Sequence, residues 1–229
     1  MLSRLAEALT PVVGRLTVTV DAGVDFAPGS VIAANHTSLA DPAVVLAALR
    51  RLGVEPVVMA TAGLWRVPVL GRALVREGHI PVRRGDRRAA EALNDAAAAL
   101  GRGRLVLIYA EGRLPLRADV AEAAPEAFRS GLSRLVHLTG APVIPLGQAG
   151  ARRISSGSTV KQLAGAVTAP LRRPALHVHV GTPVVLADER RRTADARAAV
   201  TAAWRTAVGH LDGTPRSGPS PASARAAGG

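Results

Sequence analysis

The chain has 229 residues, no cysteine, 2% aromatic residues and a formal net charge of +12. This length fits one domain with a sizeable core, and the absence of cysteine excludes disulfides and thiolate metal sites and fits a reducing compartment. The positive charge is almost entirely arginine, since Lys161 is the only lysine, and it favours a phosphorylated substrate, an anionic membrane surface or nucleic acid as a partner.

The hydrophobic pattern predicts strands and helices that alternate along most of the chain. Short apolar runs predict strands at residues 16–20, 31–34, 56–60, 80–83, 105–109, 142–146 and 175–180. Helical periodicity predicts helices at residues 42–50, 87–100, 131–139 and 193–211, and a helix interrupted by Pro68 within residues 64–75. The alternation predicts the α/β class, with a central, mostly buried mixed sheet flanked by helices.

The two ends of the chain are expected to differ from this region. Residues 1–20 carry leucine and valine at roughly helical spacing beside Arg4 and Arg15, and Pro11 is expected to shorten any helix. This amphipathic segment either lies on a membrane surface or packs on the core as a first helix. We expect the domain itself at residues 21–211 and, because Gly, Pro, Ser and Ala dominate it, a disordered tail at 212–229. No run is long enough to predict a spanning helix, and no signal peptide is predicted.

The most informative local pattern is Asn35-His-Thr-Ser-Leu-Ala-Asp41-Pro42, in which four residues separate a histidine from an aspartate. A neutral imidazole can take a proton from an alcohol near neutral pH, and a carboxylate on its other nitrogen fixes the tautomer. On one ideal helix the two side chains would diverge by about 140°. Pro42 instead predicts that a helix begins there and that His36 lies in the turn before it, where the imidazole can fold back onto Asp41. The pair is therefore predicted to be a general base that activates a hydroxyl, the alternative being that Asp41 only caps a helix.

Two further loops beside predicted strands add candidate binding residues. Residues 78–85 begin with a glycine and end in Arg83 and Arg84, and further arginines follow, so this loop can hold a phosphate. A solvated basic face is the alternative. The loop after strand 105–109 contains Glu111, Gly112 and Arg113. Here the glycine lets the backbone approach a ligand, the glutamate orients an arginine or a backbone group, and the arginine reaches an anion; the alternative is a plain surface loop.

A third candidate is the stretch Ala141-Pro-Val-Ile-Pro-Leu-Gly147, a predicted strand bracketed by prolines. Proline cannot donate to a strand ladder. We expect Pro145 and its strand to wall an apolar pocket, and a simple edge strand is the alternative.

Taken in order, these stretches resemble the four sequence blocks of the glycerolipid acyltransferase family, which contains the 1-acylglycerol-3-phosphate acyltransferases. The blocks correspond to Asn35-His36-X4-Asp41, Gly78-X-Ile80-X3-Arg84, Glu111-Gly112 with a nearby arginine, and Val143-Ile-Pro145. The third block differs from the family's usual Phe-Pro-Glu-Gly-Thr-Arg, since here it reads Tyr109-Ala-Glu-Gly-Arg-Leu114. The family associates that arginine with the acceptor phosphate, so the identity of the acceptor stays open.

The resemblance implies the glycerol-3-phosphate acyltransferase fold and an enzyme that works without a metal or other cofactor. It implies transfer of a fatty acyl group from acyl-CoA or acyl-carrier protein to the hydroxyl of 1-acylglycerol-3-phosphate, in phospholipid biosynthesis. His36 would be the base and Asp41 its orienting partner. The substrate-binding positions implied are Asn35, Gly78, Arg83, Arg84, Glu111, Gly112, Arg113 and Pro145, with Arg84 and Arg113 on the acceptor phosphate and Pro145 along the acyl chain.

Alternative functions differ in acceptor or in class. Glycerol-3-phosphate or another lipid alcohol can replace the acceptor. The resemblance implies a cytoplasmic protein that lies peripherally on an anionic membrane surface. The competing class is a non-catalytic nucleic-acid or anionic-surface binding protein, but no nucleic acid is expected because no helix-turn-helix signature, RNA-recognition motif or set of stacking aromatics is present.

Overall fold

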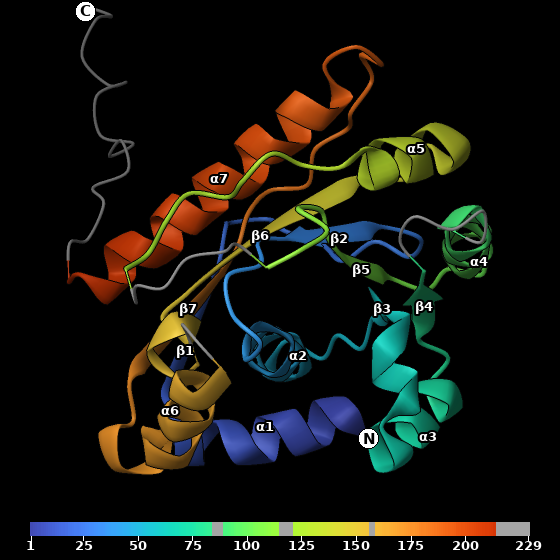
Figure 1. The fold of residues 1–229 in the computed structure, drawn as a ribbon. Helices are drawn as coiled ribbons and strands as arrows, with labels where there is room; N and C mark the ends of the chain where they lie inside the picture. Colours follow the sequence, from blue (N-terminus) through green and yellow to red (C-terminus); the bar gives the residue numbers. More distant parts are fainter. Residues whose placement is uncertain (84–88, 115–120, 156–158, 214–229) are drawn as a thin grey trace, which may run out of the picture.

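The computed structural model describes residues 1–83, 89–114, 121–155 and 159–213 (Figure 1). Its centre is a seven-stranded sheet in the order β1-β7-β6-β2-β5-β3-β4. The strands are β1 (Arg15–Val20), β2 (Val31–Ala34), β3 (Val57–Thr61), β4 (Ile80–Val82), β5 (Val106–Tyr109), β6 (Val143–Ala149) and β7 (Ala175–Val180). Neighbouring strands are parallel except β6 and β7, which are antiparallel. The predicted α/β class with a central mixed sheet is confirmed.

Helices cover both faces of this sheet. They are α1 (Leu2–Val13), α2 (Asp41–Arg51), α3 (Pro68–Arg76), α4 (Ala89–Gly101), α5 (Ser130–Thr139), α6 (Thr159–Arg172) and α7 (Arg192–Leu211), with short 3-10 helices η1 (Ala62–Arg66) and η2 (Ala151–Arg153). Val31 and Ala33 of β2 pack in a core with α4, α5 and α7, whereas Ile32 and Ala34 pack in a second core with α2. Burial on both faces explains why the central strands are continuously apolar in sequence.

The N-terminal segment contributes to the same body. α1 packs on α2, and β1 forms one edge of the sheet beside β7, so residues 1–20 are not separate from the domain. α1 continues through Pro11 to Val13, so the expectation that Pro11 shortens the helix is wrong; only two helical residues follow it. No helix in the described part of the chain is long and apolar enough to span a membrane.

Two other features differ from the prediction. α6 was not expected, because Gly165 and Pro170 break its helical sequence pattern. β6 lies in the interior of the sheet between β7 and β2, so the alternative of a simple edge strand is wrong. The predicted disordered tail lies outside the described residues from position 214 onward.

The strand directions place the candidate loops together. β2, β3, β4, β5 and β6 run parallel, so their carboxyl ends lie at one edge of the sheet. In α/β sheets ligands bind at this edge. The loops after β2, β4 and β5, which hold most of the predicted site residues, start here.

Candidate active site

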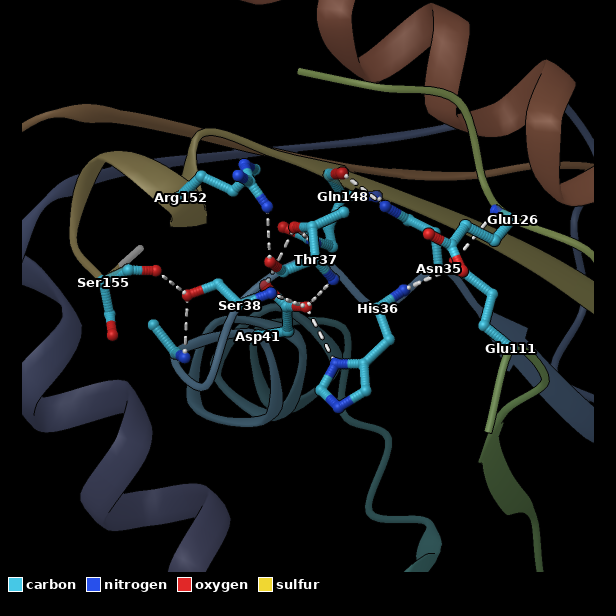
Figure 2. Close-up of polar contacts among 11 residues, drawn as sticks. Asn35, His36, Thr37, Ser38, Asp41, Glu111, Glu126, Gln148, Arg152 and Ser155 are labelled. Carbon is cyan, nitrogen blue, oxygen red and sulfur yellow. Dashed lines mark hydrogen bonds and ion pairs between the residues drawn. The ribbon is translucent and has the colours of Figure 1, made fainter. Parts of the chain in front are cut away.

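The structure brings His36 and Asp41 together in the turn between β2 and α2. His36 Nδ1 lies 2.9 Å from Asp41 Oδ2 (Figure 2). α2 begins at Asp41, one residue before the predicted start at Pro42, and Pro42 occupies its first turn. The turn, rather than a helix, therefore closes the gap between the two side chains.

The Asp41 carboxylate is fully buried and well supplied with donors. Its Oδ2 accepts backbone N–H groups from Thr37 at 2.5 Å and Ser38 at 2.8 Å, and its Oδ1 accepts the Thr37 hydroxyl at 3.4 Å. It makes no side-chain cap of its own helix, so the capping alternative does not describe it. With these donors the carboxylate has one orientation and accepts the Nδ1 proton of His36. The other ring nitrogen, Nε2, then carries the lone pair of the neutral imidazole.

Nε2 of His36 is the open end of this pair. The side chain is 15% exposed, and within the described ranges Nε2 has no hydrogen-bond partner. Figure 2 shows the ring edge with Nε2 directed away from Asp41. The ring packs on Tyr109, with centroids 4.4 Å apart. Burial, and then the Asp41 charge, raises the pKa of Tyr109 well above its usual range, so this phenol stays protonated.

Glu111 holds the backbone of the histidine. It is 3% exposed, its Oε1 accepts the His36 N–H at 2.8 Å, and its Oε2 accepts the Glu126 N–H at 2.8 Å. Burial raises the pKa of Glu111, and the two backbone hydrogen bonds oppose that shift. Of the two roles predicted for this residue, the structure shows orientation of a backbone group.

The neighbouring Gly112 and Arg113 lie at a turn after β5. Gly112 has φ +70°, and a Cβ there would lie 3.0 Å from Arg129 Cγ, so the turn requires glycine. The Arg113 side chain is 56% exposed and its Nη2 lies 3.4 Å from Glu126 Oε2. The structure thus places Arg113 on Glu126 at the surface and not on the His36–Asp41 pair.

Asn35 and Pro145 are buried between β2 and β6. Asn35 Nδ2 donates to the Gln148 carbonyl at 3.0 Å, and its Oδ1 accepts the Gln148 N–H at 2.8 Å, which prolongs the ladder of these strands. Pro145 pairs with Ala33 and packs against Gly181. Both residues support the pairing of β2 with β6, just before the turn that carries His36, and contact with substrate stays a prediction for them.

Of the predicted phosphate loop, Arg83 lies further along the same edge, whereas Gly78 precedes β4 and lies at the opposite, amino end of that strand. Gly78, with φ +70°, forms the turn between α3 and β4, and Arg83 is exposed directly after β4. Arg84 lies outside the described residues. β4 is three strands from β2, which is about 14 Å across the sheet. An acceptor held there would extend along the sheet edge toward His36.

Sequence reasoning missed a group of residues that holds the loop of residues 36–40. Gln148 Nε2 donates to the Thr37 hydroxyl at 2.9 Å, Arg152 Nη1 donates to the Thr37 carbonyl at 3.0 Å, and the Ser38 hydroxyl donates to the Ser155 carbonyl at 2.6 Å. Thr37 and Ser38 carry a signal, since short hydroxyl side chains before a helix often bond to nearby backbone. No local pattern links them to Gln148, Arg152 or Ser155, more than 110 residues away.

The arrangement is that of a general base, since the neighbouring hydroxyls of Thr37 and Ser38 donate to Asp41 and to the Ser155 carbonyl and not to His36. His36 presents a lone pair at the surface, and its partner Asp41 can stabilise the imidazolium that forms. No group of three or more His, Asp or Glu side chains in the described part of the chain could hold a metal ion.

Comparisons with known proteins identify the family and a similar fold. Residues 15–148 match the family model named Acyltransferase. The fold is similar to the crystal structure of the 1-acyl-sn-glycerophosphate (LPA) acyltransferase PlsC from Thermotoga maritima, with a TM-score of 0.66 and 16% sequence identity over 90% of this chain and 77% of that chain. No curated protein matches the sequence.

Proposed function

The chain belongs to the acyltransferase family, and we propose that it transfers a fatty acyl group from acyl-CoA or acyl-carrier protein to the hydroxyl of 1-acylglycerol-3-phosphate. The observation that carries this proposal is the 2.9 Å contact of His36 Nδ1 with buried Asp41, which leaves Nε2 open to a substrate hydroxyl. The likeness to PlsC supports the fold on which this site is built.

The proposed reaction uses the two ring nitrogens of His36 differently, with Nδ1 bound to Asp41 and Nε2 as the proton acceptor. Nε2 of His36 takes the proton of the acceptor hydroxyl while the hydroxyl oxygen attacks the thioester carbonyl carbon. The tetrahedral intermediate then expels the thiolate, and Nε2 returns the proton to the sulfur. The products are an ester and a free thiol. The Asp41 carboxylate stabilises the imidazolium between the two proton transfers.

A phosphorylated acceptor is favoured by Arg83, which follows β4, and by Arg84, the next residue in the sequence. Because Arg113 contacts Glu126, we propose that Arg83 and Arg84 bind the acceptor phosphate. A bidentate arginine clamp positions the acceptor as well as binding it. Glycerol-3-phosphate or another lipid alcohol is the alternative acceptor.

We place the enzyme on the anionic, cytoplasmic surface of a membrane, because α1 turns its leucines outward. α1 packs through small residues, with Ser3, Ala6 and Thr10 buried, whereas Leu5, Leu9 and Val12 are 51–52% exposed. Of the two roles expected for this segment, packing on the core is seen in the contacts of α1 with α2, and the outward leucines favour membrane contact in addition.

The same side of the molecule carries further apolar and basic residues. α1, α3 and α6 lie together at the bottom of Figure 1, and α1 packs on α6. Large apolar side chains exposed on α3 and α6 are Val69, Val75, Val167 and Leu171. Exposed arginines on these three helices are Arg4, Arg72, Arg76 and Arg172. An apolar surface with basic residues among its apolar ones suits an anionic bilayer, where each nearby cation contributes about 1 kcal/mol.

The test is an assay of the purified protein with a matrix of donors and acceptors. The donors are acyl-CoA and acyl-carrier protein thioesters, and the acceptors are 1-acylglycerol-3-phosphate, glycerol-3-phosphate and a neutral lipid alcohol. We expect mass spectrometry to find a diacylated phosphorylated product with the first acceptor. Transfer only to another acceptor would reassign the substrate. Absence of transfer from every donor, with salt-dependent binding to DNA, would favour the nucleic-acid alternative.

A further inference from the structure

The loop between His36 and Asp41 is held from outside by the chain that follows β6. Arg152 in η2, Gln148 at the end of β6 and Ser155 just after η2 each make a hydrogen bond to Thr37 or Ser38 (Figure 2). Arg152 and Ser155 lie beyond residues 15–148, the part that matches the family model.

The peptide unit between Thr37 and Ser38 links two charged groups. Its carbonyl oxygen, from Thr37, accepts Arg152 Nη1 at 3.0 Å. Its N–H group, from Ser38, donates to Asp41 Oδ2 at 2.8 Å. A cation at the oxygen end and an anion at the hydrogen end both polarise the same amide in the same sense. Hydrogen bonds in such a chain strengthen one another, and a low dielectric increases the effect.

This chain of contacts lies in the protein interior and ends on the catalytic ring. Arg152 is 3% exposed and Asp41 is fully buried. Asp41 Oδ2 is also the atom that contacts His36 Nδ1. A second path runs from Gln148 Nε2 through the Thr37 hydroxyl to Asp41 Oδ1. Burial of an arginine is costly unless its charge is compensated. Burial raises the pKa of Glu122 and the Arg152 charge opposes that rise, so the hydrogen bond of Arg152 to the Thr37 carbonyl belongs to a wider buried network of charged groups.

We propose that Arg152 is a positioning residue for the proton transfer: through the Thr37–Ser38 peptide it holds the Asp41 carboxylate in line with His36 Nδ1. The inference rests on the proposed function for its kinetic part. Removing the guanidinium frees the peptide to rotate, so Asp41 loses a donor and the imidazole loses its fixed orientation. Substrate contacts are untouched, so the effect falls on kcat.

The experiment compares Arg152→Met with Arg153→Met, since the neighbouring Arg153 is exposed and its loss changes the net charge equally. We expect Arg152→Met to lower kcat by about 10- to 100-fold and to leave both substrate KM values within about three-fold. Arg153→Met should behave as wild type. Arg152→Lys keeps a buried cation and a donor, and should recover a large part of kcat. If the Met variant does not fold, Arg152→Gln, which lacks the charge but keeps a donor, replaces it and should still lower kcat relative to Arg152→Lys.

A second readout needs no substrate. In the wild type the Nδ1–H proton of His36, held by Asp41, should give a downfield NMR signal in slow exchange with water, and Arg152→Met should broaden or remove it in the folded protein. A lowered melting temperature with wild-type kcat and an unchanged signal would show a purely structural role and overturn the proposal. If the wild type transfers no acyl group but Arg152→Met still loses the signal, the proposed function is refuted and the positioning role stands.

Discussion

At the scale of single residues, the site depends on carboxylates that accept backbone N–H groups. Asp41 accepts the amides of Thr37 and Ser38, and Glu111 accepts those of His36 and Glu126. Both carboxylates are nearly or fully buried, so each amide that lost its acceptor would be left unpaired. The backbone around His36 is therefore fixed on both sides of the ring.

Glu111→Gln tests this fixing. A glutamine offers one oxygen and one NH2 group, so one of the two backbone N–H donors would face another donor. We expect the free energy of unfolding to fall by about 1–3 kcal/mol. Measured by urea denaturation, the matched change Glu126→Gln should cost about 0–1 kcal/mol, because that side chain is 39% exposed and forms an exposed ion pair with Arg113. Equal losses in the two variants would show that Glu111 does not hold the loop.

At the scale of elements, local sequence patterns predicted the strands, most of the helices and the turn before α2. The central strands are continuous apolar runs in the sequence because helices cover both faces of the sheet. Pro42 correctly indicated a turn before α2. α6 was missed because Gly165 and Pro170 obscure its periodicity. The contacts of Arg152 with the Thr37 loop could not be predicted, since they depend on β6 lying beside β2, a pairing between residues more than 110 positions apart.

β7 and α7 share a cluster of histidines that makes stability depend on pH. His177 of β7 stacks on His210 of α7 with ring centroids 4.4 Å apart, and its Nε2 lies 2.9 Å from the Thr19 hydroxyl. Burial, and then the charges of His210 and His179, lower the pKa of His177 from 6.5 to about 4. Between these values the unfolded chain binds the proton and the folded protein does not. The contribution of neutral His177 to the free energy of unfolding is thus fully present above pH 6.5 and is lost as the pH falls toward 4.

His177→Gln should reduce this acid sensitivity. Glutamine keeps a hydrogen bond to Thr19 but does not titrate, so the slope of unfolding free energy against pH should fall by up to about 1.4 kcal/mol per pH unit in this window. Urea denaturation at several pH values from 4 to 7 measures it. The exposed His137, changed to Gln, is the control. An unchanged slope in His177→Gln would contradict the assignment.

At the scale of the whole molecule, the site and the proposed membrane surface must act together, because the proposed acceptor is a lipid. Leu9→Ser removes an outward leucine of α1, and Leu138→Ser removes an equally exposed leucine of α5. Burial of a leucine side chain in the bilayer contributes about 1.5–3 kcal/mol, so Leu9→Ser should weaken binding to anionic vesicles about tenfold or more. Flotation with phosphatidylglycerol vesicles measures it. Equal binding of both variants would place the membrane contact elsewhere.

The central claim is that His36, oriented by Asp41, is the general base of an acyl transfer. The most direct measurement is the turnover of His36→Ala with the donor and acceptor that the wild type uses, beside the exposed-histidine control His137→Ala and a melting curve for each protein. We predict that kcat falls by about 100-fold or more in His36→Ala, with a melting temperature close to that of the wild type and full activity in the control. Near-wild-type turnover in folded His36→Ala would contradict the claim.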